Sequence, residues 1–195
     1  INQQARERWY KYLVDHYRFG KRTGIEQGFE ATGFIPEHNK GFALSLTYAN
    51  TSFGQAMTAT PLQMAAALSG VINGGTYYQP RLVDKVVTEN GKEKIKKPVV
   101  LETNVVSKQT GEDVKKMMEY VVAEHTFNPR LPAGYSIGGK TGTAQIANPA
   151  GGYFADRFNG TYLGFVGGDK AQYVITVRVN EPKIGGYAGS GAAQP

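Results

Sequence analysis

The order of the predicted helices and strands constrains the fold of this 195-residue chain more than any other feature. Apolar residues at steps of three and four predict three helices, and runs of β-forming residues between turn signals predict five strands. The helices are expected over residues 3–19, over residues 61–72 and from about Thr110 to Val122, and the strands over residues 81–88, 92–95, 136–146, 161–166 and 172–179. Helices followed by consecutive strands indicate an α+β domain, in which an antiparallel sheet is flanked by helices.

Short sequence signals mark the ends of several of these elements. The Thr-Pro-Leu-Gln run at residues 60–63 combines a capping threonine, a proline in the first helical position and a capping-box glutamine. Gly20 is expected to end the first helix. The Asn-Gly pair at residues 90–91 predicts a tight hairpin turn, and residues 167–170 predict a second hairpin.

Each predicted helix has one apolar face, which we expect to be buried. These faces comprise Trp9, Tyr12, Leu13, His16 and Phe19 in the first helix, Met64, Ala65, Leu68, Val71 and Ile72 in the second, and Val114, Met117, Met118, Val121 and Val122 in the third. We interpret the stripe of methionine and valine in the third helix as core packing and not as a cofactor pocket.

Composition bounds the possible classes of protein. The chain is long enough for one domain with a hydrophobic core, and no apolar run reaches the length of a membrane span. The absence of cysteine excludes disulfides and thiolate chemistry and fits an extracytoplasmic protein. The net charge of +6 is compatible with nucleic acid, an anionic membrane surface or an anionic polymer. The lysines at positions 92, 94, 96 and 97 are interpreted as a solvated hairpin edge that resists pairing with other strands.

The Gly-Gly-Lys-Thr-Gly-Thr-Ala-Gln run at residues 138–145 is the strongest candidate for a binding site. In a strand, Lys140 and Gly142 share one face, and Thr141 and Thr143 share the other. A glycine inside a strand often marks the close approach of a ligand or of another backbone. A strand edge with a cation and hydroxyl groups suits an extended substrate that carries a carboxylate.

The blocks around this run resemble the penicillin-binding proteins. Lys-Thr-Gly belongs, together with Ser-x-x-Lys and a Ser-x-Asn-type motif, to the signature set of β-lactamases and penicillin-binding proteins. Further blocks agree with that family in the same order along the chain. They are Phe19-Gly20 with Thr23-Gly24-Ile25, residues 51–55 with residues 58–65, Asn73-Gly74-Gly75 with Pro80, and Glu181-Pro182 with Gly185-Gly186-Tyr187-Ala188-Gly189. The Phe-Gly-Gln form at residues 53–55 resembles the class B, monofunctional transpeptidases.

The resemblance implies a partial penicillin-binding-protein or β-lactamase-like transpeptidase fold and a peptidoglycan D,D-transpeptidase activity. A serine of such an enzyme attacks the D-Ala-D-Ala amide of a stem peptide, and the acyl-enzyme then passes its acyl group to an amine of a neighbouring stem. Carried over by resemblance, Lys140 is a catalytic cation that helps to organise proton transfer. Thr141 binds the carboxylate of the substrate or β-lactam, Gly142 lets the substrate lie against the strand, and Thr143 supplies an oxyanion-hole N–H and a hydroxyl contact.

The nucleophile itself is expected to lie outside this sequence. None of the six serines has lysine three positions on or asparagine two positions on. We therefore expect residues 1–195 to be the C-terminal portion of a transpeptidase domain, with the Ser-x-x-Lys and Ser-x-Asn motifs upstream, the last helix missing, and no activity alone. The resemblance also implies a membrane-anchored parent protein on the outer face of the bacterial cytoplasmic membrane, with stem peptides, β-lactams and cell-wall synthesis proteins as partners, and no nucleic acid, cofactor or metal.

Two other classes remain open from the residues alone. One is a β-lactamase or β-lactam sensor domain, and the other is a non-catalytic module that binds an anionic polymer through its basic surface. His125 is expected to cap a helix C-terminus, and His16 and His38 do not suggest a metal site. We expect residues 148–159 to form a loop whose aromatics Tyr153, Phe154 and Phe158 either line a substrate groove or are incidental.

Overall fold

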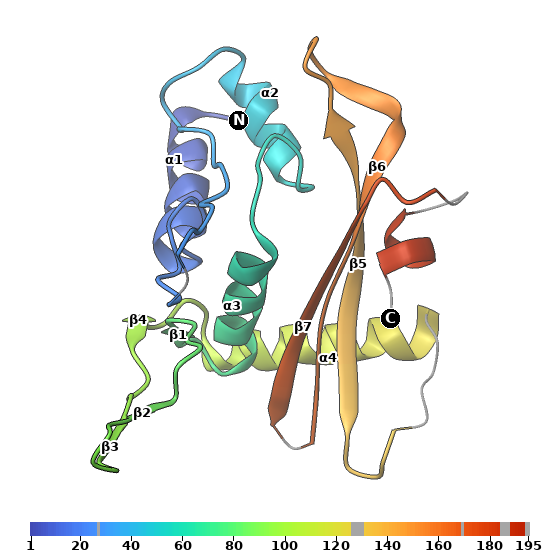
Figure 1. Cartoon of the computed structure of the whole chain (residues 1–195). Helices are drawn as coiled ribbons and strands as arrows, with labels where there is room; N and C mark the ends of the chain where they lie inside the picture. The colour runs from blue at the N-terminus through green and yellow to red at the C-terminus, as the bar shows by residue number, and fades with distance from the viewer. Residues whose placement is uncertain (27, 126–130, 169, 184–187, 194–195) are drawn as a thin grey trace. The chain divides into compact units, whose positions relative to one another are not determined.

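The computed structural model describes residues 1–26, 28–125, 131–168, 170–183 and 188–193 (Figure 1). The chain divides into two compact units, Ile1–Ser107 and Lys108–Pro195, which are described separately. The first contains α1 (Gln3–Lys11), the π-helical segment η1 (Tyr12–His16), α2 (Leu44–Thr51), α3 (Pro61–Ile72), β1 (Tyr77–Tyr78), β2 (Lys85–Val87), β3 (Glu93–Ile95) and β4 (Val100–Glu102). The second contains α4 (Lys108–His125), β5 (Ser136–Ala147), β6 (Tyr153–Gly167), β7 (Ala171–Asn180) and the π-helical segment η2 (Gly189–Ala193).

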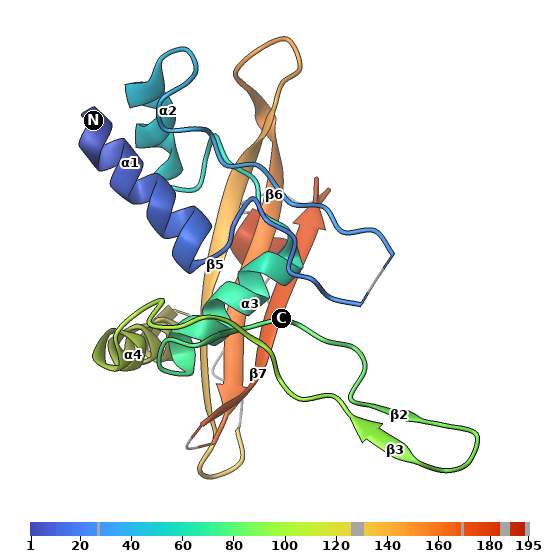
Figure 2. The same ribbon diagram turned by 90° about the vertical axis from the view of Figure 1, so that its left-hand side faces the viewer.

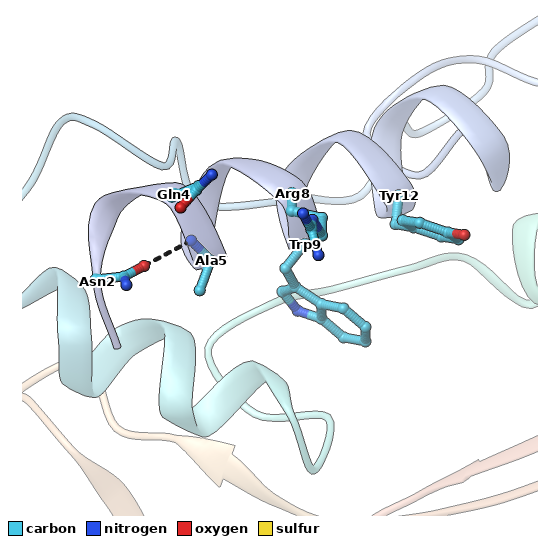
Figure 3. A pocket seen from close by; sticks show the side chains of 6 residues that line it. All are labelled: Asn2, Gln4, Ala5, Arg8, Trp9 and Tyr12. Atoms are coloured by element: carbon cyan, nitrogen blue, oxygen red, sulfur yellow. Dashed lines mark hydrogen bonds between the residues drawn. The ribbon is translucent and has the colours of Figure 1, made fainter.

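The first predicted helix ends earlier than expected and buries less of its apolar face. The Asn2 side chain caps α1 by accepting a hydrogen bond from Ala5 N at 2.8 Å (Figure 3). After Lys11 the helix widens into η1, so the 3.6-residue period that predicted one continuous face no longer holds. Trp9 and Tyr12 are 41% and 45% exposed, whereas Leu13 is buried.

The helix start at residues 60–63 is confirmed. The Thr60 hydroxyl accepts from Gln63 N at 3.1 Å, and the Gln63 side chain accepts from Thr60 N at 2.9 Å, which completes a capping box. The expected buried face is correct for Leu68 but wrong for its neighbours. Small residues let the helix approach its surroundings on a different side, so the buried set comprises Gln63, Ala66, Ala67, Leu68 and Gly70, and Met64, Ala65, Val71 and Ile72 are only half-buried.

The core of the first unit joins helix and loop residues that are distant in the sequence. Its buried members are Leu13, Phe19, Ile35, Ala66, Ala67, Tyr77 and Val105. Gln63 lies at the margin of this core with no exposed surface. Its side-chain amide donates to the carbonyl oxygens of Lys21 and Thr32, at 2.8 Å and 2.7 Å, and so attaches the loop before α2 to α3.

The strands of the first unit are short. β1 pairs with β4, and β2 pairs with β3 in an antiparallel hairpin that projects from the unit (Figure 2). The Asn-Gly hairpin is therefore confirmed, but the strand expected over residues 81–88 is reduced to β2, and Arg81 and Asp84 before it pair with each other at 3.0 Å. The lysines at positions 92, 94, 96 and 97 are exposed, as expected of a solvated edge. Lys96 pairs with Glu26 at 2.8 Å, and this pair, together with a hydrogen bond from Leu82 N, lowers the pKa of Glu26 to about 2.

The second unit is a three-stranded antiparallel sheet in the order β5-β6-β7 (Figure 1). The strand expected over residues 136–146 is confirmed within one residue, and the two later strands lie within β6 and β7. α4 packs against the sheet at β5, where a Cβ built on Gly138 lies 3.1 Å from Glu119 N. η2 contacts β5, β6 and β7.

The third predicted helix begins two residues earlier than expected, at Lys108. Its apolar stripe is only partly core. Val122 is buried, but Met117 is 60% exposed. A helix that lies on one face of a sheet buries only a narrow stripe, and the five apolar residues predicted for this helix span a wider one.

The loop expected over residues 148–159 is wrong. The connection needs only residues 148–152, where Asn148 N donates to Gly152 O and where Gly151 and Gly152 have φ values of 109° and 70°. β6 begins at Tyr153, and the aromatic residues of the expected loop therefore belong to a strand. The pairing register between β5 and β6 shifts between Gln145 and Ala147. Because of this irregularity, the start of β6 lacks the regular alternation of apolar and polar residues from which a strand is predicted.

No helix among the described residues is both long enough and apolar enough to cross a membrane.

Candidate functional site

The run at residues 138–145 lies on β5, which is one of the two edge strands of the described sheet. β5 pairs with β6 along one side, and no described strand of its own unit pairs with its other side. Peptide N–H and C=O groups that point toward that second side have no sheet partner within the unit. An unpaired strand edge of this kind can bind an extended ligand by main-chain hydrogen bonds.

The register of β5 on β6 confirms the expected division of side chains between the two faces. Lys140 and Gly142 lie opposite Leu163 and Thr161, whereas Thr141 and Thr143 lie opposite Tyr162 and Gly160. Residues directly opposite each other in an antiparallel pair project from the same face. The side chains of Lys140 and of the two threonines therefore start on opposite faces of the strand, within four consecutive residues.

Two adjacent glycines at the start of the run receive aromatic rings from β6 on opposite faces. A Cβ on Gly138 would lie 2.5 Å from the Phe165 ring, and a Cβ on Gly139 would collide with the Tyr162 phenol. Phe165 and Tyr162 are 1% and 4% exposed, and burial raises the pKa of Tyr162. The buried rings therefore pack closely on β5 just before Lys140.

Lys140 is exposed and turns toward its neighbour. Its Nζ donates to Thr141 O at 3.0 Å and lies 3.5 Å from Thr141 Oγ1. An ammonium group and a hydroxyl are therefore adjacent at the surface of an edge strand. Together they offer a positive charge and a hydrogen-bond donor, which is the combination that binds a carboxylate.

Gly142 has a packing role that the sequence did not reveal. A Cβ at this position would collide with Thr161 Oγ1, on the strand that pairs with β5. A residue with a side chain here would therefore force the Thr161 side chain to move, so the packing of the sheet also favours glycine at this position.

Thr143 contacts a segment that the sequence reasoning left out of the site. Gly189 N donates to Thr143 Oγ1 at 2.9 Å. A Cβ on Gly189 would collide with the carbonyl oxygen of Gly142, and a Cβ on Gly160 would collide with the carbonyl oxygen of Ala188. In the sequence, only the glycines at positions 160 and 189 could have pointed to this close contact. The residues around positions 188–189 do not indicate that this segment reaches β5.

The other candidates of the sequence do not join this site. Tyr12 stacks on His16 with ring centroids 4.5 Å apart, and His38 lies beside Tyr10 at 5.3 Å. No group of three His, Asp or Glu side chains within the described residues could hold a metal ion. The side chain of His125 lies outside the described residues, as do Asp169, Gly185, Gly186 and Tyr187.

Tyr153, Phe154 and Phe158, for which a groove-lining role was left open, lie on the extension of β6 beyond the run. Phe154 lies 4.3 Å from the guanidinium carbon of Arg157, which pairs with Glu181 through two hydrogen bonds of 2.8 Å and 2.6 Å. Glu181 follows β7, so this ion pair attaches the end of β7 to β6. Gln145 Nε2 also donates to Phe154 O, at 3.2 Å.

Comparison with known proteins identifies the family. The sequence profile of the penicillin binding protein transpeptidase domain matches residues 2–195. Stage V sporulation protein D of Bacillus subtilis is 35% identical, over 92% of this chain and 27% of its own length. Peptidoglycan D,D-transpeptidase FtsI of Escherichia coli is 28% identical, over 94% of this chain and 29% of its own length.

The fold agrees as well. The crystal structure of penicillin binding protein 3 from Mycobacterium tuberculosis, complexed with ampicillin, superposes with a TM-score of 0.80 at 30% identity, over 96% of this chain and 42% of that chain. The chain therefore belongs to the penicillin-binding protein transpeptidase family, and the class B resemblance and the α+β fold are confirmed. It spans less than a third of the length of the two curated relatives.

Proposed function

We propose that residues 1–195 form part of a serine-type peptidoglycan D,D-transpeptidase that cross-links stem peptides and is acylated by β-lactams. β5 supplies one wall of the binding site for the acyl donor. The observation that carries the proposal is the adjacency of the Lys140 ammonium and the Thr141 hydroxyl on an edge strand. Support also comes from the activity in the name of the Escherichia coli relative and from the ampicillin bound to the Mycobacterium tuberculosis protein.

Each residue of the run has a physical role in this reaction. The charge of Lys140 favours the anionic ligand and stabilises the proton transfers around the attacking serine. The Thr141 hydroxyl donates to the terminal carboxylate of the stem peptide or β-lactam, because an ionised carboxylate only accepts hydrogen bonds. Thr143 N–H is one donor to the oxyanion that forms when the serine attacks, and the Thr143 hydroxyl is a second donor to the carboxylate. Because Gly142 has no side chain, the ligand can lie against the strand between Thr141 and Thr143.

The nucleophile belongs to a part of the protein outside these 195 residues. We infer a Ser-x-x-Lys serine and a Ser-x-Asn motif upstream, because no serine of this chain has the required spacing. The order of elements in the family also implies a final helix downstream. The chain alone is expected to be inactive. We place the whole protein on the outer face of the cytoplasmic membrane, with cell-wall synthesis proteins as its neighbours.

Thr141→Val in the longer protein that carries this chain tests the role of the run. Valine keeps the shape and the β propensity of threonine but cannot donate to a carboxylate. A hydrogen bond to a charged group contributes about 1.5–3 kcal/mol, so the second-order rate constant of acylation by a fluorescent penicillin should fall roughly 10- to 100-fold. The measurement is labelling under pseudo-first-order conditions, together with the thermal unfolding midpoint.

Thr176→Val is the matched control, because Thr176 is a half-buried threonine on β7, two strands away from β5. It should leave acylation unchanged. Equal acylation of Thr141→Val and the unsubstituted protein would remove Thr141 from carboxylate binding. Rapid hydrolysis of the acyl-enzyme would instead favour a β-lactamase, and salt-sensitive polymer binding without acylation would favour a non-catalytic module.

A further inference from the structure

The contact between Gly189 and Thr143 joins the start of η2 to the candidate binding strand. Gly189 N donates to Thr143 Oγ1 at 2.9 Å, from a position 46 residues further along the chain. Gly189 is buried, whereas Thr143 is exposed. The hydrogen bond therefore reaches from the packed interior of the unit to a side chain at its surface.

Missing side chains on both sides make this contact possible. Thr143 lies directly opposite Gly160 on β6. Since Gly160 has no Cβ, the carbonyl oxygen of Ala188 occupies the space beside it, and the next residue reaches Thr143. Gly189 itself has no room for a side chain, because a Cβ there would collide with the carbonyl oxygen of Gly142. The backbone of residues 188–189 thus lies directly on the β5–β6 pair.

The contact determines which way the Thr143 hydroxyl can act. A threonine hydroxyl has one proton to donate and two lone pairs that accept. Because the Gly189 amide donates to one lone pair, the hydroxyl proton must point away from Gly189. A hydroxyl held in this way is a donor to a group outside the contact, and an ionised carboxylate is the acceptor that benefits most from it.

We propose that Gly189 is a positioning residue for ligand selectivity, whose amide orients the Thr143 hydroxyl toward the carboxylate of the bound stem peptide or β-lactam. The inference rests on the proposed function, since it assumes that this strand binds an acylating ligand. It goes beyond that function because it assigns the recognition of the negative charge partly to a backbone group after β7. The expected signature is a loss of preference for the ionised carboxylate, without a general loss of reactivity.

The test replaces the Gly189 amide by an ester in the longer protein, with glycolic acid incorporated in place of glycine. This change deletes the N–H and adds no atom where a Cβ would collide. Acylation rate constants are measured with benzylpenicillin and with its methyl ester, which lacks the negative charge. We expect the rate constant with benzylpenicillin to fall about tenfold and the rate constant with the methyl ester to stay within twofold.

Two further variants separate orientation from structure. In a Thr143→Val background, where no hydroxyl remains, the Gly189 ester should cause no additional change in the acylation rate constants. In a Thr143→Ser background, which keeps the hydroxyl, the ester should still lower the rate constant with benzylpenicillin. An ester at Ala150 is the matched control, since Ala150 N also donates to a side-chain oxygen, Asn148 Oδ1 at 2.9 Å, in the turn between β5 and β6. It should change neither rate constant.

The possible outcomes distinguish this inference from the function on which it rests. Three results with the Gly189 ester would contradict the role of Gly189 but leave the proposed function intact. They are an equal fall of the rate constants with both ligands, an unchanged rate constant with benzylpenicillin, and an effect that adds to that of Thr143→Val. A failure of the unsubstituted protein to react with benzylpenicillin would contradict the proposed transpeptidase function, and this inference with it.

Discussion

Replacing Lys140 by methionine in the longer protein is expected to lower β-lactam acylation by about 10²–10³-fold, the range measured when one preorganised electrostatic group is deleted from an active site. Methionine keeps an unbranched side chain of similar length but removes the positive charge. The Nζ of Lys140 lies beside the Thr141 hydroxyl, on the exposed side of an edge strand. The charge is therefore available to a ligand, and its loss should not disturb the packing of β5 on β6.

Lys116→Met controls for the general effect of removing one positive charge. Lys116 is an exposed lysine on α4, in the same unit. Its substitution should leave acylation within twofold and should match the thermal stability of Lys140→Met. The measurement is the rate of labelling by a fluorescent penicillin at two ionic strengths. Similar acylation of the two variants would show that Lys140 is an ordinary solvated lysine.

The second large effect concerns stability, and we expect it for Gln63→Met. The Gln63 side chain is fully buried and makes three hydrogen bonds, from Nε2 to Lys21 O and Thr32 O and to Oε1 from Thr60 N. Methionine has a similar volume, but it leaves two carbonyl groups and one N–H without these partners. Each lost bond costs about 1 kcal/mol and more where the group stays dry, so the free energy of unfolding should fall by about 3 kcal/mol.

Hydrogen exchange locates this effect as well as measuring it. Because Gln63 attaches the loop before α2 to α3, the amides of residues 28–33 should exchange much faster in Gln63→Met, while those of β5–β7 should change little. Gln109→Met is the control, since Gln109 is exposed and its side chain donates to Asp113, at 2.9 Å, on its own helix. Surface substitutions usually change the free energy of unfolding by no more than about 0.5 kcal/mol. If the unfolding free energies of Gln63→Met and Gln109→Met agreed within this range, the result would contradict the anchoring role of Gln63.

The sequence predicted those parts of the fold whose signals are local. The capping box at residues 60–63 and the Asn-Gly hairpin are set by a few neighbouring residues, and both formed as expected. β5 was also predicted within one residue, because apolar residues, Ile137 and Ile146, lie at the two ends of the run. The positions of Lys140 and the two threonines on opposite faces followed from that strand alone.

Features that depend on distant contacts could not be predicted in this way. α2 carries no periodic apolar face and begins after Ala43, whose φ of 51° is unusual for a residue with a side chain, so no helix was expected there. The π-helical turn after Lys11 changed the side of the helix that is buried. The contact of Gly189 with Thr143 joins residues 46 positions apart, and only the fold brings them together.

Mapping the covalent adduct formed by a β-lactam on the longer protein tests the central account most directly. After labelling with benzylpenicillin and proteolysis, mass spectrometry should find one acylated serine, in a Ser-x-x-Lys motif outside residues 1–195, and the isolated chain should carry no adduct. Labelling should become slower when Lys140 or Thr141 is substituted, because β5 binds the ligand that the distant serine attacks. A stoichiometric adduct on one of the six serines of this chain, or no adduct on the longer protein, would contradict the account.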